Sequence, residues 1–157
     1  MKLSCGFLLT YNESLLLCRV TLSNPVRWDI PKGEYEPEGE DNYTLSDINE
    51  RHFLCAIREL FEETGLLLGT IPYWTKEATK DLGIFQYLPN KQLHLFHFNS
   101  LEPIPADKLI CLSVFERYGK SYPEVDAYKY VPFSDIINHA SNKLYPVLER
   151  ALNLSHV

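Results

Sequence analysis

A single helical pattern, at residues 46–64, lies in the middle of a chain whose other apolar runs are mostly short. Ser46 and Asp47 are good N-cap residues, and Gly65 follows the last helical residue, where a left-handed conformation is favoured. The apolar residues at helical spacing are Phe53, Ile57, Leu60 and Phe61. With strands before and after it, such a helix is typical of an α/β fold.

Six short apolar runs have the pattern of β-strands. Two precede the helix, at residues 3–9 and 14–20, and four follow it, at residues 82–87, 93–98, 110–115 and 128–133. We expect a loop at residues 34–43, which are acidic and contain proline and glycine. Residues 133–153 favour a closing helix, whose last part Pro146 starts or kinks. No repeat or linker divides the chain, and the pattern predicts an α/β sandwich on a mixed sheet.

The net charge of −6 argues against a protein that grips long nucleic acid, because phosphate neutralisation needs a basic face. It is compatible with a small anionic substrate whose charge is met by metal ions. No stretch approaches the roughly 18 apolar residues of a membrane helix. The four cysteines have no close ligand spacing, so we expect free thiols in a reducing cytoplasm.

Three carboxylates stand at offsets i, i+3 and i+4 near the end of the predicted helix, at Glu59, Glu62 and Glu63. Such residues share one helix face, where each pair of like charges costs about 0.2–0.5 kcal/mol. The helix dipole also disfavours negative charge in the last turn. Stability alone does not favour this arrangement, whereas a hard divalent cation does, because Mg²⁺ takes oxygen ligands from carboxylates and substrate phosphates.

Residues 58–66, RELFEETGL, resemble the signature helix of the Nudix hydrolase family, R-E-U-x-E-E-x-G-U, where U is aliphatic. All seven specified positions match, with Leu60 and Leu66 as the aliphatic residues. Residues 28–33, WDIPKG, resemble the segment that commonly leads into this helix. The resemblance implies a single Nudix hydrolase domain over residues 1–157 and a Nudix-type α/β/α sandwich around a mixed β-sheet. It also implies hydrolysis of a diphosphate linkage in a nucleotide-like substrate.

The spacing before this helix departs from the family pattern, G-x5-E-x7-R-E-U-x-E-E-x-G-U. Gly33 is the leading glycine, but Arg58 follows it by 25 positions, more than the pattern allows. The box glutamate is then either Glu40, which the loop context favours, or Glu50, which keeps the spacing to Arg58. The extra residues, 41–50, lengthen the helix at its start or bulge beside the site.

The resemblance implies a role for each residue of the motif. Glu59, Glu62 and Glu63 bind Mg²⁺, for which Mn²⁺ can substitute, and the backbone carbonyl of Gly33 is a further ligand. The metal ions bridge the diphosphate and acidify a water, which is the nucleophile. Arg58, which stands four residues before Glu62 on the helix, orients carboxylates and does not touch the substrate.

Residues 122–131 resemble the late element P-E-x-D-x-x-x-W-V of family members that act on capped or dinucleoside polyphosphate substrates. In those relatives its glutamate is an additional metal ligand, which here is Glu124. The element indicates a dinucleoside polyphosphate or the 5′-triphosphate end of RNA, and the acidic net charge favours the former. Nucleoside triphosphates and nucleotide sugars stay open, and so does the general base, with Glu59 and Glu124 as candidates.

Further residues are candidates for substrate contacts. Lys32, next to the leading glycine, can pair with a phosphate. The aromatic candidates for stacking on a base are Trp28, Tyr87, Tyr122 and Tyr128. The histidines, by contrast, form no cluster at zinc spacing, and we expect core or surface roles for His52, His94, His97 and His139.

Two other classes of protein remain to be weighed. An isomerase of isoprenoid diphosphates needs a reactive cysteine and a modified helix motif, whereas the hydrolytic motif here is whole. A non-catalytic nucleotide-sensing module usually lacks box glutamates and carries a DNA-binding domain, and the sequence shows neither change. We therefore predict a Mg²⁺-dependent pyrophosphohydrolase, a monomer or homodimer, acting on a small nucleotide-like diphosphate. The sensing module and an RNA 5′-pyrophosphohydrolase are the alternatives.

Overall fold

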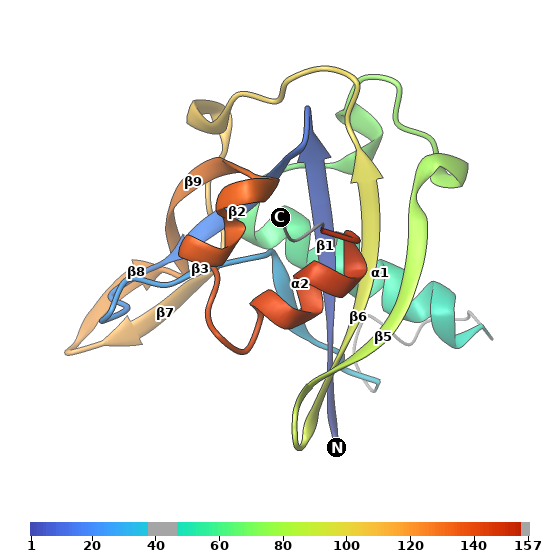
Figure 1. Cartoon of the computed structure of the whole chain (residues 1–157). Helices are drawn as coiled ribbons and strands as arrows, with labels where there is room; N and C mark the ends of the chain where they lie inside the picture. The colour runs from blue at the N-terminus through green and yellow to red at the C-terminus, as the bar shows by residue number, and fades with distance from the viewer. Residues whose placement is uncertain (38–46, 155–157) are drawn as a thin grey trace.

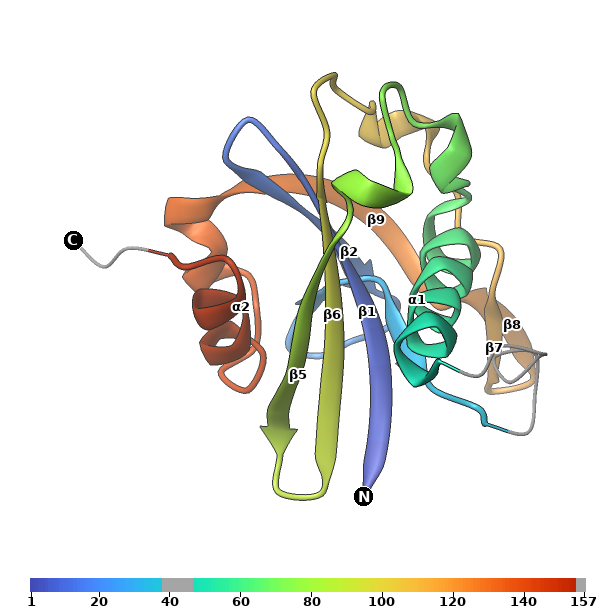
Figure 2. The same ribbon diagram turned by 90° about the vertical axis from the view of Figure 1, so that its right-hand side faces the viewer.

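The structure is a computed structural model that describes residues 1–37 and 47–154 (Figures 1 and 2). Its strands are β1 (Lys2–Tyr11), β2 (Ser14–Val20), β3 (Trp28–Asp29), β4 (Lys32–Glu34), β5 (Lys80–Leu88), β6 (Lys91–Asn99), β7 (Val114–Arg117), β8 (Lys120–Pro123) and β9 (Val125–Pro132). Its α-helices are α1 (Ile48–Thr64) and α2 (Tyr145–Ala151). Short 3-10 helices are η2 (Leu68–Thr70), η3 (Lys76–Ala78), η4 (Ala106–Lys108) and η5 (Phe133–Asn138).

The main sheet is mixed, as the sequence predicts. Its strands follow the order β3-β2-β1-β6-β5, with β4 also paired to β1 and β9 to β2. β1 runs parallel to β6, and the other pairings in this sheet are antiparallel. Residues 5–10 of β1 are buried without interruption, because both faces of this central strand are covered.

Helices α1 and α2 cover opposite faces of the sheet, with the strands between them (Figure 2). Side chains of β1 alternate between the faces, so that Phe7 packs on the α1 side and Leu8 on the α2 side. The α1-side core includes Phe53, Leu60, Phe96 and Phe98. The α2-side core includes Leu15, Leu17, Leu93, Leu95 and Leu148. These two cores confirm the α/β/α sandwich.

The central helix has the caps that its sequence predicts. At its start, the Asp47 side chain accepts a hydrogen bond from the Asn49 N–H at 2.9 Å. At its end, Gly65 has a φ of 75°, in the left-handed region that favours glycine. A Cβ at this position would also come within 3.1 Å of Ile110. Both the backbone conformation and a close neighbour therefore favour glycine at this position.

The strand predicted at residues 110–115 is wrong. Only β7 forms there, and it pairs with β8 in a separate hairpin that projects from the body (Figure 1). The preceding residues donate N–H groups to the end of α1 instead, from Ile110 to the Thr64 carbonyl (3.1 Å) and from Leu112 to the Glu62 carbonyl (2.6 Å). The last carbonyls of a helix lack partners within it. Residues 110–113 therefore cap α1 and cannot pair as a strand.

The single closing helix predicted over residues 133–153 is also wrong. The segment divides into η5 and α2, which are joined by residues 139–144. Within that connection, Ala140 forms an isolated parallel bridge with Trp28. Pro146 stands in the first turn of α2. Backbone N–H groups in the first turn have no acceptor within the helix, so the N–H that proline lacks costs no helical hydrogen bond.

None of the helices within residues 1–37 and 47–154 is long and apolar enough to cross a membrane. All four cysteines are free thiols: Cys5, Cys18 and Cys55 are buried, and Cys111 is partly exposed. Burial raises the pKa of the Cys18 thiol well above its usual value. This thiol is therefore an inert part of the core.

Candidate active site

Two of the three motif glutamates lie on the buried face of α1. The buried positions of the helix (52, 53, 55, 56, 59, 60, 63 and 64) form one continuous stripe. The stripe ends with Glu59 and Glu63, which are 7% and 6% exposed. Glu62 lies beside it, with 37% of its side chain exposed. Because carboxylates are seldom buried to this degree without a function or a partner, the end of α1 is a candidate site.

Gly33 allows the backbone of β4 to approach Glu59 closely. β4 is held antiparallel to β1, with Gly33 opposite Cys5. A Cβ at Gly33 would lie 2.0 Å from the carboxyl carbon of Glu59, far inside van der Waals contact. The structure therefore brings the leading glycine of the motif against its first glutamate.

Arg58 contacts two of the glutamates. Its Nη1 atom lies 3.0 Å from Glu59 Oε1 and 3.5 Å from Glu62 Oε1. Its Nη2 atom lies 3.6 Å from the Cys55 sulfur. This geometry suits the role of orienting the carboxylates.

Burial and mutual repulsion raise the pKa of both buried carboxyl groups. Burial, followed by the charge of Glu62, raises the pKa of Glu59 to about 7, although Arg58 opposes the shift. Burial again, followed by the charges of Glu59 and Asp29, raises the pKa of Glu63 to about 9. Burial and the neighbouring carboxylates therefore disfavour the charged form of both groups.

A hard divalent cation fits the chemistry of these side chains. The donors are carboxylate oxygens, and a cation beside them would stabilise their charged form. Among the residues that the structure describes, no group of three or more His, Cys, Asp or Glu side chains forms a ready metal cage. A preformed cage is not required, because Mg²⁺ is commonly held by one or two carboxylates together with water and substrate phosphates.

A cavity of about 350 Å³ opens beside Glu63. Three residues that the sequence singled out, Lys32, Glu63 and Glu124, line it. Its lining also includes residues that no motif marks, namely Arg27, Phe115 and Arg117. The fold thus joins the end of α1, the β3–β4 segment and the region around β7 and β9 at one opening.

Lys32 remains charged at the wall of this cavity. Its Nζ atom lies 3.2 Å from Asp29 Oδ2 and 5.6 Å from the ring centroid of Tyr87. Burial lowers the pKa of Lys32, but Asp29 and Tyr87 raise it, and the net pKa lies above its usual value. A permanent positive charge at this position suits a phosphate oxygen.

Glu124 is held beside the cavity through its backbone. Its N–H donates to the Ser113 carbonyl (3.0 Å), and its carbonyl accepts from the Thr21 N–H (3.1 Å). The Ser113 N–H in turn donates to the Glu62 carbonyl at 3.1 Å. The end of α1 therefore fixes the segment that carries Glu124, which connects two motifs that are far apart in the sequence.

None of the four aromatic candidates lines this cavity in the described part of the chain. Trp28 and Tyr87 pack against the α2-side core. The Tyr128 hydroxyl donates to the backbone carbonyl of Glu63, and burial raises the pKa of Tyr128 well above its usual value. Tyr128 therefore supports the end of α1, and base stacking by any of the four aromatic candidates stays a prediction.

The two candidates for the box glutamate have different outcomes. Glu40 lies outside the described residues, together with Ser46 and the insertion up to residue 46. Glu50 stands in the first turn of α1, with its Oε2 atom 2.8 Å from Lys76 Nζ. A helix rises about 1.5 Å per residue, so Glu50 lies about 20 Å from Glu63 along the axis. Glu50 is therefore at the far end of α1 from the cavity.

Two of the histidines, His52 and His94, are buried in the core and are in contact with each other. Nδ1 of His52 on α1 lies 2.8 Å from Nδ1 of His94 on β6, and Nε2 of His94 lies 2.6 Å from Asp81 Oδ1. The contact forms because α1 packs across β6. His97 contacts Thr10 instead, as expected for a residue on the opposite face of β6.

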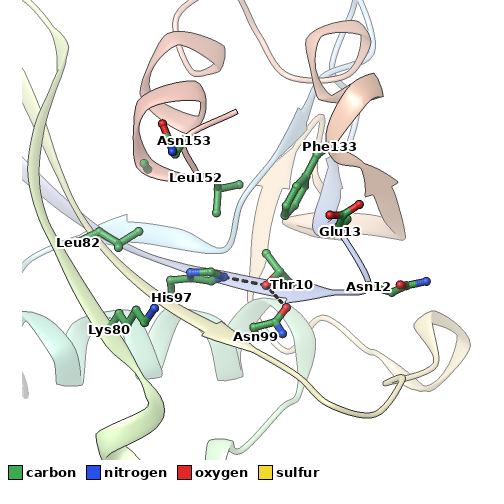
Figure 3. A pocket seen from close by; sticks show the side chains of 11 residues that line it. Thr10, Asn12, Glu13, Lys80, Leu82, His97, Asn99, Phe133, Leu152 and Asn153 are labelled. Carbon is green, nitrogen blue, oxygen red and sulfur yellow. Dashed lines mark hydrogen bonds between the residues drawn. The ribbon is translucent and has the colours of Figure 1, made fainter. Parts of the chain in front are cut away.

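A second cavity, of about 450 Å³, lies between the sheet and the end of α2 (Figure 3). The Thr10 hydroxyl there donates to Asn99 Oδ1 at 2.8 Å and lies 2.7 Å from His97 Nε2. These polar groups satisfy one another. None of the described motif residues lines this cavity, so the smaller cavity beside Glu63 is the candidate active site.

Comparison with known proteins identifies the family. The family model described as "NUDIX domain" matches residues 3–151. A relative from Enterobacteria phage T4, the "uncharacterized 17.7 kDa protein in e-segB intergenic region", is 34% identical over 142 residues, covering 83% of this chain and 82% of the relative. The chain therefore belongs to the Nudix family. Its enzyme class is that of the Nudix pyrophosphohydrolases.

Solved structures confirm the fold. An Ap4A hydrolase of C. elegans, in a binary complex, matches with a TM-score of 0.62 and 17% identity, over 98% of this chain and 96% of that chain. A NUDIX hydrolase of Alicyclobacillus acidocaldarius matches with a TM-score of 0.64 and 14% identity, over 98% and 91% of the two chains. Identities this low support the fold alone.

Proposed function

We propose that the chain is a Mg²⁺-dependent hydrolase that cleaves a diphosphate linkage in a nucleoside diphosphate derivative. The observation that carries this proposal is the burial of Glu59 and Glu63 where α1 meets Gly33 and the cavity. Two neighbouring buried carboxylates are stabilised by a bound cation. We also propose that residues 1–157 act as one Nudix domain.

Glu59, Glu62 and Glu63 would hold the metal ions, and Mn²⁺ would substitute for Mg²⁺. The Gly33 carbonyl and Glu124 would supply further oxygen ligands. When bound, Mg²⁺ neutralises charge on the diphosphate and acidifies the attacking water. All of these donors are oxygens, which is the donor type that Mg²⁺ prefers.

The side chains around the metal ligands supply orientation and proton transfer. Arg58 holds the Glu59 and Glu62 carboxylates through its two ion pairs. Lys32 binds a phosphate oxygen. We assign the general base to Glu124, because it is exposed and lines the cavity, whereas Glu59 is buried and paired with Arg58.

We favour a dinucleoside polyphosphate as substrate. The element that resembles that branch of the family places Glu124 at the cavity, and one protein of this fold is an Ap4A hydrolase. Nucleoside triphosphates and nucleotide sugars are the competing classes. The net charge of −6 disfavours polymeric nucleic acid. We propose a cytoplasmic monomer or homodimer.

A substrate panel tests the proposed function. Diadenosine tetraphosphate, ATP, ADP-glucose and 5′-triphosphorylated RNA are each incubated with Mg²⁺ or with EDTA, and the products are separated. We expect cleavage of diadenosine tetraphosphate with Mg²⁺ and none with EDTA. Equal turnover in EDTA contradicts the metal dependence. Binding without turnover of any substrate favours the nucleotide-sensing module, and faster cleavage of RNA ends favours the RNA pyrophosphohydrolase.

A further inference from the structure

Two arginines at the cavity have no carboxylate partner among the residues that the structure describes. Arg27 and Arg117 both line the opening beside Glu63. Within residues 1–37 and 47–154, neither has an acidic side chain at ion-pair distance, whereas Lys32 in the same cavity pairs with Asp29. In a chain with a net charge of −6, two unpaired guanidinium groups at one opening indicate a binding surface for an anion.

The backbone of Arg27 is fixed beside the metal side of the cavity. Its carbonyl accepts from the Val20 N–H at 2.9 Å, and its N–H donates to the Ser23 hydroxyl at 3.0 Å. The residue that follows β2, Thr21, donates its N–H to the Glu124 carbonyl at 3.1 Å. Arg27 and Glu124 are therefore attached to adjacent positions at the end of β2.

Arg117 belongs to one face of the β7–β8 hairpin. Phe115 is paired with Tyr122 and Arg117 with Lys120, and alternate residues and their cross-strand partners share a face of a hairpin. The Phe115 and Tyr122 rings lie 5.8 Å apart, and the Arg117 guanidinium lies 5.6 Å from the Phe115 ring centroid. This face combines two aromatic rings with two cations and turns Phe115 and Arg117 toward the cavity.

Aromatic rings and guanidinium groups together recognise a nucleotide. Rings stack on a base, and arginine pairs with phosphate oxygens in two-point contacts. In the proposed function, one diphosphate is already bound by the metal ions on the carboxylates and by Lys32. The unpaired arginines and the aromatic pair therefore suit a part of the substrate beyond that diphosphate.

We propose that the β7–β8 hairpin and Arg27 hold the second nucleotide of a dinucleoside polyphosphate. Arg27 and Arg117 bind its phosphates, and Phe115 with Tyr122 stacks on its base. This inference rests on the proposed function and deepens it, because it assigns specificity for a dinucleoside over a nucleotide sugar to residues outside the family motif.

The test compares two substrates that share an adenosine diphosphate unit, diadenosine tetraphosphate and ADP-glucose. For Arg27→Ala and Arg117→Ala we expect KM for diadenosine tetraphosphate to rise about tenfold or more, the loss typical of a charged hydrogen bond. We expect kcat for this substrate and KM for ADP-glucose to change less than about twofold. Phe115→Leu should also raise KM for the dinucleotide, and Phe115→Tyr should restore it.

Arg150→Ala is the matched control. Like Arg117, Arg150 has its guanidinium 5.6 Å from a phenylalanine ring centroid, here that of Phe85. Unlike Arg117, it does not line this cavity in the described structure. It should change neither KM. Equal rises in KM for both substrates in Arg117→Ala, or none for the dinucleotide, overturn the inference.

If the wild-type protein hydrolyses neither substrate, the proposed function fails. Calorimetric measurement of diadenosine tetraphosphate binding then tests separately whether the β7–β8 hairpin binds the nucleotide. Binding about tenfold weaker in Arg117→Ala supports it. Unchanged affinity, or no binding to the wild type, overturns it.

Discussion

Replacing Gly33 by alanine should damage catalysis far more than folding. The added Cβ would lie 2.0 Å from the Glu59 carboxyl carbon, whereas ordinary contact begins at 3.4 Å, so the carboxylate has to move by about 1.4 Å. The clashing atoms end a flexible side chain, so the free energy of unfolding should fall by only about 1 kcal/mol, the lower end of the cost of overpacking. Misplacing a reacting group by about 1 Å costs on the order of 10²-fold in rate. We expect kcat/KM to fall by this factor, which is about 2.7 kcal/mol.

The assay measures Mg²⁺-dependent hydrolysis of diadenosine tetraphosphate beside urea unfolding. Gly69→Ala is the matched control, because a Cβ at Gly69 meets no atom within 4 Å. Gly33→Ala should add little loss to Glu59→Asp, whose shorter side chain relieves the clash. Full activity in a folded Gly33→Ala protein would refute the close approach of β4 to Glu59 as a requirement of the site.

Three further predictions concern stability. Tyr128→Phe should lower the free energy of unfolding by about 1 kcal/mol, because the Glu63 carbonyl loses its hydrogen-bond donor. Tyr130→Phe should be neutral or stabilising, because the Tyr130 hydroxyl has no hydrogen-bond partner in the described structure. Urea unfolding curves in which Tyr130→Phe is the less stable of the two variants contradict this prediction. Burial, with the charge of Lys80, lowers the pKa of His97 in the folded protein. The contribution of neutral His97 to the free energy of unfolding is therefore complete above the unfolded pKa of about 6.5, and it is lost as pH falls through the folded pKa. Urea midpoints at pH 7.5 and 5.5 should therefore differ more in the wild type than in His97→Gln, and equal differences exclude this role. Mg²⁺ should raise the thermal midpoint by binding the folded state, and an equal rise in Glu63→Gln would place the ion elsewhere.

The parts of the fold that the sequence predicts are those set by local physics. The helical period predicted at residues 46–64 and the left-handed position of Gly65 are local signals, and the structure has a helix at Ile48–Thr64 that ends at a left-handed Gly65. The motif glutamates follow from them, because helical geometry alone puts Glu59 and Glu63 on one face. The burial of these two carboxylates is not a local signal, because it depends on the packing of α1 against β1 and β4.

The remaining features depend on contacts between distant segments. Residues 110–113 have an apolar strand-like pattern, but the unpaired carbonyls of α1 bind their N–H groups. No local pattern brings His52 to His94 or Arg117 to the cavity, because those contacts arise from the packing of α1 on β6 and from the direction of the β7–β8 hairpin. An unpaired cation in particular is recognisable only when its surroundings are known.

The most direct test of the proposed metal-binding role of α1 is the turnover of Glu63→Gln beside that of Glu50→Gln. Both changes remove one carboxylate from α1, but Glu63 lies at the cavity and Glu50 pairs with Lys76 at the other end. The account predicts that Glu63→Gln lowers kcat for diadenosine tetraphosphate on the order of a thousandfold, since metal catalysis contributes several kcal/mol. It predicts that Glu50→Gln keeps the wild-type rate and that both proteins stay folded. A folded Glu63→Gln protein with the wild-type rate would contradict the account.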